Sequence, residues 1–222
     1  MTSFSKNDLK CFVCGNISPQ FMLRSTSCFG YSDLDMRPAP LKRDTINVWV
    51  HQCPYCGYAS SSIADKTTVT VEFLQRPEYL SCEGIQFKSQ LAKMFYQEYM
   101  IETHDAKPPF DLFNTMISAA WACDDATDDK NAVICRSRCL KLIDGVIENS
   151  KDRDEVIGLV LTKADLLRRT GRFDELEKEF GGIKIPDETL KTAIDFELKL
   201  AKAKDVSCHN LGEAFKDAGV EE

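Results

Sequence analysis

The sequence predicts an α+β protein that is mostly α-helical, with a small β-rich part followed by a longer helical part. One observation is a pair of cysteine motifs within residues 1–80, set among segments of alternating apolar and polar residues. A second is a change near residue 84 to apolar residues at helical spacing, with Lys and Glu between them. We therefore expect one domain over residues 1–80 and another over residues 81–222.

Charge changes at the same place in the chain. Residues 1–80 hold eight Lys/Arg and seven Asp/Glu, whereas residues 81–222 hold twenty and twenty-eight. The net charge of −7 is unlike the basic balance of most nucleic-acid-binding proteins. The sequence has no run of about 18 apolar residues and begins with no apolar leader. We expect a cytoplasmic protein without a membrane span.

The ten cysteines include two matching motifs. Cys11-Phe-Val-Cys14-Gly15 and Cys53-Pro-Tyr-Cys56-Gly57 both read CxxCG. Two intervening residues let a tight turn aim both sulfurs at one ion, and four thiolates suit tetrahedral Zn²⁺. Four thiolates leave no open position, so we expect a structural zinc at Cys11, Cys14, Cys53 and Cys56. Iron in the same four thiolates, or two separate reduced or redox pairs, are the alternatives.

Short alternating segments predict strands around these motifs. Residues 45–51 place Ile46, Val48 and Val50 on one face and run into the second motif, so we predict a strand there. Residues 21–23 follow the first motif and are expected to pair with that strand. Residues 65–74 leave two alternatives open, a strand for their β-branched content or a short helix capped by Asp65. Together these segments predict a zinc-ribbon-like β domain.

The segment over residues 27–40 carries Asp33, Asp35 and Arg37 between aromatic residues and prolines. One interpretation is a functional loop that presents these three side chains beside the zinc. The other is a long connection whose aspartates cap turns and whose prolines stiffen the chain. Long loops on small scaffolds are often functional, so both interpretations stay open.

Apolar periodicity predicts a series of helices in the second part, over residues 84–104, 110–124, 131–147, 155–169, 173–180 and 186–204. Small residues such as Ala119 and Ala120 fall where helices would touch, and Gly171 falls in a turn. This order is similar to a tetratricopeptide-like array, although its two turns, at residues 127 and 171, are further apart than in the regular repeat. A helical bundle without repeats is the alternative.

Several of these stretches resemble one uncharacterised bacterial family, a domain of unknown function. The similar residues are the first CxxCG motif, the DLDMRP run at residues 33–38, residues 48–50 with the CPYCGYA run at residues 53–59, residues 119–125 and residues 164–169. Members join a CxxC…CPxCGYA zinc-ribbon-like start to a tetratricopeptide-like helical part. Phe12 stands where members often have proline, which a cysteine turn tolerates. The resemblance implies this two-part fold and brings no activity.

The leading hypothesis for function is a protein-interaction module with a structural zinc site. Stacked helix pairs form surfaces that bind peptides or proteins, and the acidic charge would favour basic segments. A nucleic-acid-binding regulator that uses the zinc ribbon is one alternative. An enzyme centred on Asp33–Arg37 is another. The sequence contains no GxSxG, phosphate-binding, dinucleotide or HExxH motif, so we predict no catalytic residue and lean against an enzyme.

Overall fold

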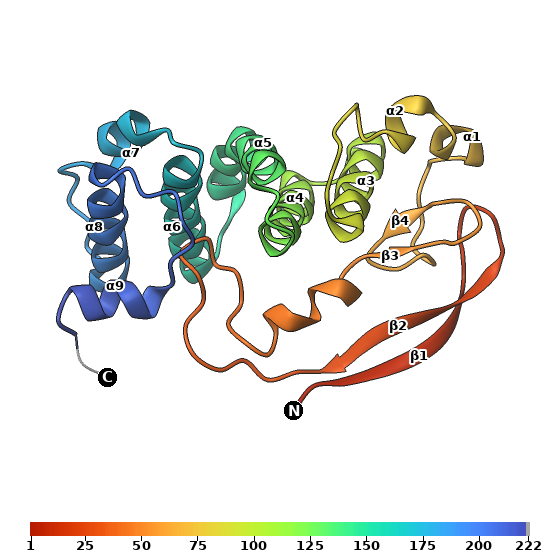
Figure 1. Ribbon diagram of the computed structural model, residues 1–222, viewed down its shortest axis with the longest axis horizontal. Helices are drawn as coiled ribbons and strands as arrows, with labels where there is room; N and C mark the ends of the chain where they lie inside the picture. Colours follow the sequence, from red (N-terminus) through yellow and green to blue (C-terminus); the bar gives the residue numbers. More distant parts are fainter. Residues whose placement is uncertain (221–222) are drawn as a thin grey trace. The chain divides into compact units, whose positions relative to one another are not determined.

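The computed structural model describes residues 1–220, and the chain divides into two compact units (Figure 1). The first unit contains Met1–Ser27 and Leu41–Cys135, and the second contains Cys28–Pro40 and the chain from Arg136 onward. The mostly helical α+β class is confirmed. The boundary expected between residues 80 and 81 lies inside the first unit. That residues 1–80 and 81–222 fold as separate domains stays a prediction.

A long two-stranded ribbon begins the first unit (Figure 1). Strand β1 (Ser3–Lys10) pairs antiparallel with β2 (Ile17–Ser25), and the first cysteine motif connects them. Residues 21–23 are extended as predicted, but they pair with β1 and not with residues 45–51. We did not predict β1, because its sequence SFSKNDLK has few of the apolar residues that mark a strand.

The strand predicted over residues 45–51 is wrong for most of its length. Arg43–Val48 forms a 3-10 helix, η1, and β3 (His51–Gln52) is a short strand paired with β4 (Ala59–Ser60). The Thr45 hydroxyl accepts a hydrogen bond from the Trp49 indole N–H at 2.9 Å and donates one to a carbonyl three residues earlier at 2.8 Å. These local hydrogen bonds favour a helical turn over an extended chain, even though the apolar residues alternate as they would in a strand.

Residues 65–74 end in a short helix and not in a strand. Helix α1 (Val71–Leu74) begins after Thr70 and not after Asp65, and α2 (Pro77–Leu80) follows it. Their apolar side chains join a core that also includes two of the motif cysteines. The buried members of this core are Cys11, Cys53, Tyr58, Ile63, Val69, Leu74, Tyr79 and Ile101.

Two long helices complete most of the first unit. Helix α3 (Gln90–His104) packs against α4 (Pro109–Asp125), as Figure 1 shows. The Ser89 hydroxyl caps α3, which begins later than the predicted residue 84. Helix α5 (Asp129–Asn149) follows and continues into the second unit. The predicted ranges 110–124 and 131–147 match α4 and α5 to within two residues at each end.

The second unit is helical apart from its connecting segments. Asp152 and Asp187 cap α6 and α8 by accepting a hydrogen bond from the backbone three residues later. The helices after α5 are α6 (Arg153–Arg169), α7 (Phe173–Phe180), α8 (Glu188–Lys202) and α9 (Leu211–Asp217). The tetratricopeptide-like arrangement stays a prediction. Within residues 1–220, no helix has both the length and the apolar character to cross a membrane.

Candidate metal centre

The two cysteine turns share one backbone geometry. Gly15 N–H donates to the Cys11 carbonyl and Gly57 N–H to the Cys53 carbonyl, both at 2.9 Å. In each turn the N–H of the first cysteine also donates to the carbonyl five residues later, at 2.8 Å. Gly15 and Gly57 have φ angles of +73° and +79°, a left-handed conformation that glycine adopts without steric cost. The glycine after each second cysteine therefore follows from the shape of the turn.

The structure brings all four predicted sulfurs together. The Sγ atoms of Cys11, Cys14, Cys53 and Cys56 lie within 4.8 Å of one another. The Cys11–Cys56 and Cys14–Cys53 Sγ–Sγ distances are both 3.7 Å. A tetrahedron with Zn–S bonds of about 2.3 Å has sulfur–sulfur edges of about 3.8 Å. The four sulfur atoms and the distances between them therefore fit a metal ion held by four thiolates.

The same distances are much longer than a disulfide bond of about 2.0 Å. All ten cysteines have free thiols, and Cys11 and Cys53 are 1% exposed. Burial raises the pKa of the Cys14 thiol, but hydrogen bonds from Asn16 outweigh this effect and lower that pKa to about 7. Burial raises the pKa of Cys56. Metal binding deprotonates its thiol ligands, so binding at this cluster would release protons.

Contacts around the second turn tie the cluster to the rest of the first unit. The Tyr79 hydroxyl donates to the Gly57 carbonyl at 2.7 Å, which connects α2 to the turn. Phe12 N–H, in the first turn, donates to the Ile63 carbonyl at 2.8 Å, beyond the second turn. A metal ion at the four cysteines would thus join the ribbon to the segment that contains β3, β4 and α2.

The predicted loop residues Asp33, Asp35 and Arg37 lie in the second unit and are buried, with 5%, 2% and 8% of their surfaces exposed. Asp33 N–H donates to the Arg37 carbonyl at 3.0 Å, so these residues close a tight turn. Backbone hydrogen bonds also join the turn to a later segment, because Leu34 N–H donates to the His209 carbonyl. These contacts favour the interpretation in which the aspartates hold the connection in place.

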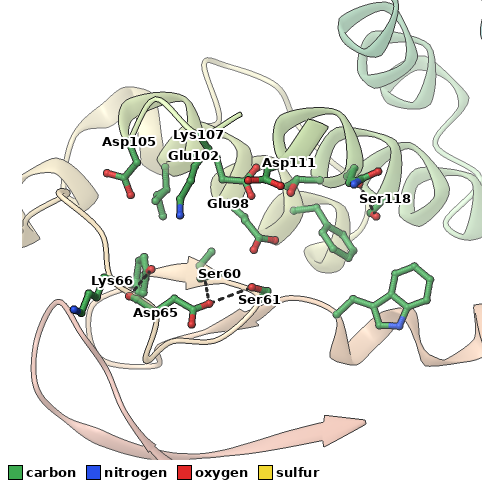
Figure 2. Close-up of a pocket in the computed structure, with 17 residues that line it drawn as sticks. Ser60, Ser61, Asp65, Lys66, Glu98, Glu102, Asp105, Lys107, Asp111 and Ser118 are labelled. Atoms are coloured by element: carbon green, nitrogen blue, oxygen red, sulfur yellow. Dashed lines mark hydrogen bonds between the residues drawn. The ribbon is translucent and has the colours of Figure 1, made fainter. Parts of the chain in front are cut away.

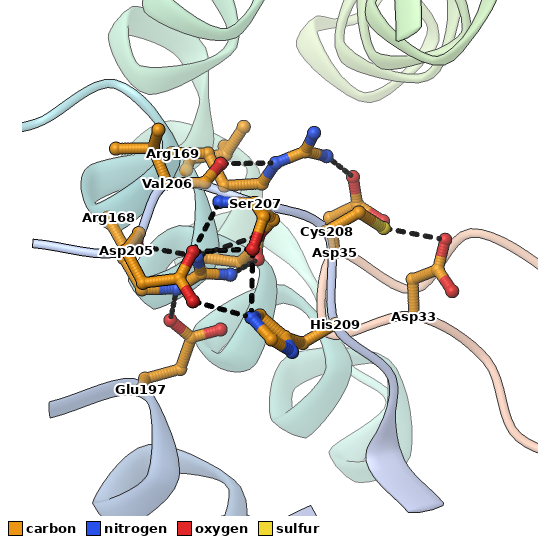
Figure 3. Close-up of polar contacts among 12 residues, drawn as sticks. Asp33, Asp35, Arg168, Arg169, Glu197, Asp205, Val206, Ser207, Cys208 and His209 are labelled. Carbon is orange, nitrogen blue, oxygen red and sulfur yellow. Dashed lines mark hydrogen bonds and ion pairs between the residues drawn. The ribbon is translucent and has the colours of Figure 1, made fainter. Parts of the chain in front are cut away.

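Charged partners surround the turn (Figure 3). The Asp35 carboxylate forms ion pairs with Arg136 at 3.5 Å and with Arg169 at 3.6 Å. The Cys208 thiol donates to the Asp33 carboxylate at 3.3 Å. The functional interpretation of Asp33, Asp35 and Arg37 stays a prediction. Its most direct test is to measure how much the two aspartates contribute to the stability of the fold.

Replacing Asp33 and Asp35 together by alanine is expected to destabilise the second unit by about 3 kcal/mol. The reason is that Arg136 and Arg169 would keep their charges and lose a buried carboxylate. Urea unfolding followed by helical circular dichroism measures the change. Asp44→Ala, at an exposed position of η1, is the control. A double variant as stable as the wild type would instead favour the functional-loop interpretation.

A third group of residues, which we did not predict as a site, lines a pocket of about 540 Å³ in the first unit. Glu98 projects from α3 toward the segment after β4, where Asp65 accepts hydrogen bonds from the Ser60 and Ser61 hydroxyls (Figure 2). Glu102 lies one helical turn further along α3, beside Thr115 of α4. Burial raises the pKa of Glu98 to about 8 and that of Glu102 to about 7. Two acids at i and i+4 of a helix usually indicate a solvated face, so the sequence alone did not reveal this pocket.

Comparison with protein-family models finds no matching family, and comparison with curated proteins and with solved structures finds no match either. The expected family therefore stays a resemblance. The structure supports one part of that resemblance, the cluster of Cys11, Cys14, Cys53 and Cys56, whose arrangement could hold a metal ion.

Proposed function

We propose that Cys11, Cys14, Cys53 and Cys56 hold one structural zinc ion, and that the zinc supports a protein-interaction module. The observation that carries this proposal is the pair of 3.7 Å sulfur–sulfur distances in a group of four thiols within 4.8 Å. A closed set of four thiolates is typical of structural zinc, because no position remains for a water or substrate. Iron, the alternative ion, is distinguished by metal analysis.

Exposed aromatic side chains support the interaction role. Phe12 and Tyr55 lie inside the two CxxC turns and are 47% and 64% exposed. Phe4 and Phe21 of the ribbon are also 47% and 57% exposed. Aromatic residues are enriched where proteins bind one another, and a metal ion would hold the two turns in fixed positions. We propose that the partner is another protein or a peptide, and that the binding takes place in the cytoplasm.

A nucleic-acid-binding regulator is the second candidate, because the same exposed aromatic rings offer stacking surfaces for unpaired bases. The Lys6 ammonium lies 5.9 Å from the centre of the Phe21 ring, which places a cation beside one of them. Binding of this kind would weaken steeply as salt concentration rises. An enzyme that uses Asp33–Arg37 is the weaker proposal, since these residues are buried and paired.

Native mass spectrometry with metal identification tests the leading proposal on gently purified protein. We expect one zinc ion per chain, lost on acidification as the thiolates take up protons. We also expect that Phe12→Ser with Tyr55→Ser retains the zinc and loses the partner that the wild type carries. A metal-free, folded wild type would overturn the zinc proposal, and equal partner binding by the variant would overturn the role of these two rings.

A further inference from the structure

The pocket beside α3 has an excess of acidic side chains and aromatic walls. Its lining includes five carboxylates and two ammonium groups. Its volume of about 540 Å³ falls within the roughly 300–1,000 Å³ that small-molecule sites occupy. We propose that this pocket binds an organic cation that carries ammonium groups along an aliphatic chain. This amine site is separate from the proposed structural zinc. It rests on the zinc proposal in one respect, because the zinc would hold the segment after β4 in position.

Two carboxylates carry the argument for a cation, one on the buried Glu98 and one on the half-buried Glu102. Glu98 is 5% exposed, and its partner is the backbone N–H of Ser61. Oε2 of Glu102 is buried without a hydrogen-bond partner. Across residues 1–220, neither Glu98 nor Glu102 has a lysine, arginine or histidine nitrogen within 4.0 Å, although Lys107 is near enough to Glu102 to lower its pKa against the effect of burial. A buried carboxylate without a cation is unfavourable, and a ligand that supplies positive charge would relieve that cost.

The spacing of the carboxylates favours an extended cation over a metal ion. Over the described part of the chain, the four cysteines are the one group of three or more His, Cys, Asp or Glu residues whose ligand atoms converge within 4.8 Å. The acids of the pocket therefore do not gather around one point, as the six or more oxygens of a Mg²⁺ or Ca²⁺ site would. Glu98 and Glu102 lie one helical turn apart on α3, and Asp111 lies on α4. A ligand whose ammonium groups are spaced along an aliphatic chain matches this arrangement of carboxylates.

The aromatic lining suits the aliphatic part of such a ligand. Trp49, Tyr58 and Phe95 contribute to the walls. Their rings offer apolar surface to methylene groups, and an aromatic face attracts a nearby ammonium group. A free polyamine and a lysine side chain of a peptide both present this chemistry, so the experiment must separate these two sources.

Ionisation of the pocket predicts how binding depends on pH. Burial, and then the charge of Glu102, raises the pKa of Glu98 to about 8, and burial raises that of Glu102 to about 7. Both acids are therefore partly protonated at neutral pH, and an ammonium ligand would favour their charged forms and release protons. The other titratable groups that line the pocket are Tyr58, Asp65, Lys66, Asp105, Lys107 and Asp111. Affinity should increase from pH 6 to pH 7.5, a range over which the ammonium groups of the ligand keep their charge.

Isothermal titration calorimetry of the full zinc-loaded chain with spermidine tests the proposal. A short acetylated peptide with one lysine is the second probe, and MgCl₂ the third. We expect spermidine or the peptide to bind, with at least tenfold weaker binding to Glu98→Gln with Glu102→Gln and little pH dependence in that variant. The stronger of the two probes then identifies the source of the ammonium group.

The matched control is Glu175→Gln with Glu179→Gln, which removes two charges at the same i, i+4 spacing from the exposed face of α7. It should bind like the wild type. The proposal is overturned if neither probe binds at millimolar concentration, if MgCl₂ alone binds, or if both double variants weaken binding equally. Zinc content is measured in every sample, so that the two proposals are tested separately. A protein that contains zinc but binds no amine refutes the amine site alone. A protein that binds the amine but contains no zinc refutes the zinc proposal alone.

Discussion

Cys53→Ser is expected to abolish tight metal binding and to unfold the part of the first unit around the two cysteine turns. Structural zinc contributes about 10–16 kcal/mol of binding free energy in zinc-finger peptides, which is as large as the total stability of many domains. Cys53 is 1% exposed and belongs to the core that includes Tyr58, Ile63 and Tyr79. Loss of the ion would therefore remove the cross-link and expose that core.

The second unit should keep its fold in the Cys53→Ser variant, because its core contains none of the four cysteines. Far-ultraviolet circular dichroism should thus retain most of its helical signal, while zinc content falls from one ion per chain to none. Heating followed by tryptophan fluorescence adds a local readout, since Trp49 and Trp121 both lie in the first unit.

Cys139→Ser is the matched control, since Cys139 is 0% exposed and lies outside the cluster. A buried hydroxyl there would lower stability by about 1–3 kcal/mol without changing zinc content. A Cys53→Ser protein that is metal-free and as stable as the wild type would contradict the structural-zinc interpretation.

Each half of the four-cysteine cluster could be predicted from sequence because the geometry of a CxxCG turn is local, and the matching of the two motifs predicted that they meet. Two residues between cysteines and a glycine after them define each turn, and the structure closes both turns with the same hydrogen bonds. The long helices were predictable for a similar reason. Apolar periodicity identifies α7 at Phe173–Phe180 to the residue, and it places α4 and α5 nearly as well.

Sequence reasoning failed where contacts between distant residues decide the outcome. The partners of Asp35 include Arg136, 101 residues away, so a buried ion pair could not be distinguished from an exposed loop. Glu98 and Glu102 line a pocket because α4 and the segment after β4 lie beside them, and the sequence shows neither contact. The 3-10 helix at Arg43–Val48 was missed for a different reason, because the alternating pattern of residues 45–51 is only seven residues long and also fits a helical turn.

A second large effect is expected at the centre of the second unit, where Arg168 is fully buried with its charge. Its guanidinium pairs with Glu197 (Figure 3) and, at 2.7 Å, with Asp165. All three side chains are at most 2% exposed. It also donates to the carbonyls of Asp205 and Ser207, at 2.9 Å and 2.8 Å. One side chain therefore connects α6 to α8 and to the segment before α9.

Arg168→Ala is expected to destabilise the second unit by about 5 kcal/mol, at the upper end for breaking a buried pair, because two carboxylates lose their cation. Arg172→Ala removes a partly exposed guanidinium that pairs with the exposed Glu175, and should change stability little. Urea unfolding of both variants measures the difference. Adding Glu197→Leu to Arg168→Ala should recover part of the loss, because one unpaired charge disappears.

The loss caused by Arg168→Ala should also depend on pH. Burial raises the pKa of both Asp165 and Glu197 in the folded protein, even beside Arg168. Acids with a raised folded pKa stabilise the fold less as pH rises, because the unfolded chain releases their protons first. Without Arg168 both pKa values rise further, so the destabilisation should be larger at pH 8.5 than at pH 5.5. An equal loss at both pH values would mean that Arg168 acts through packing and not through charge.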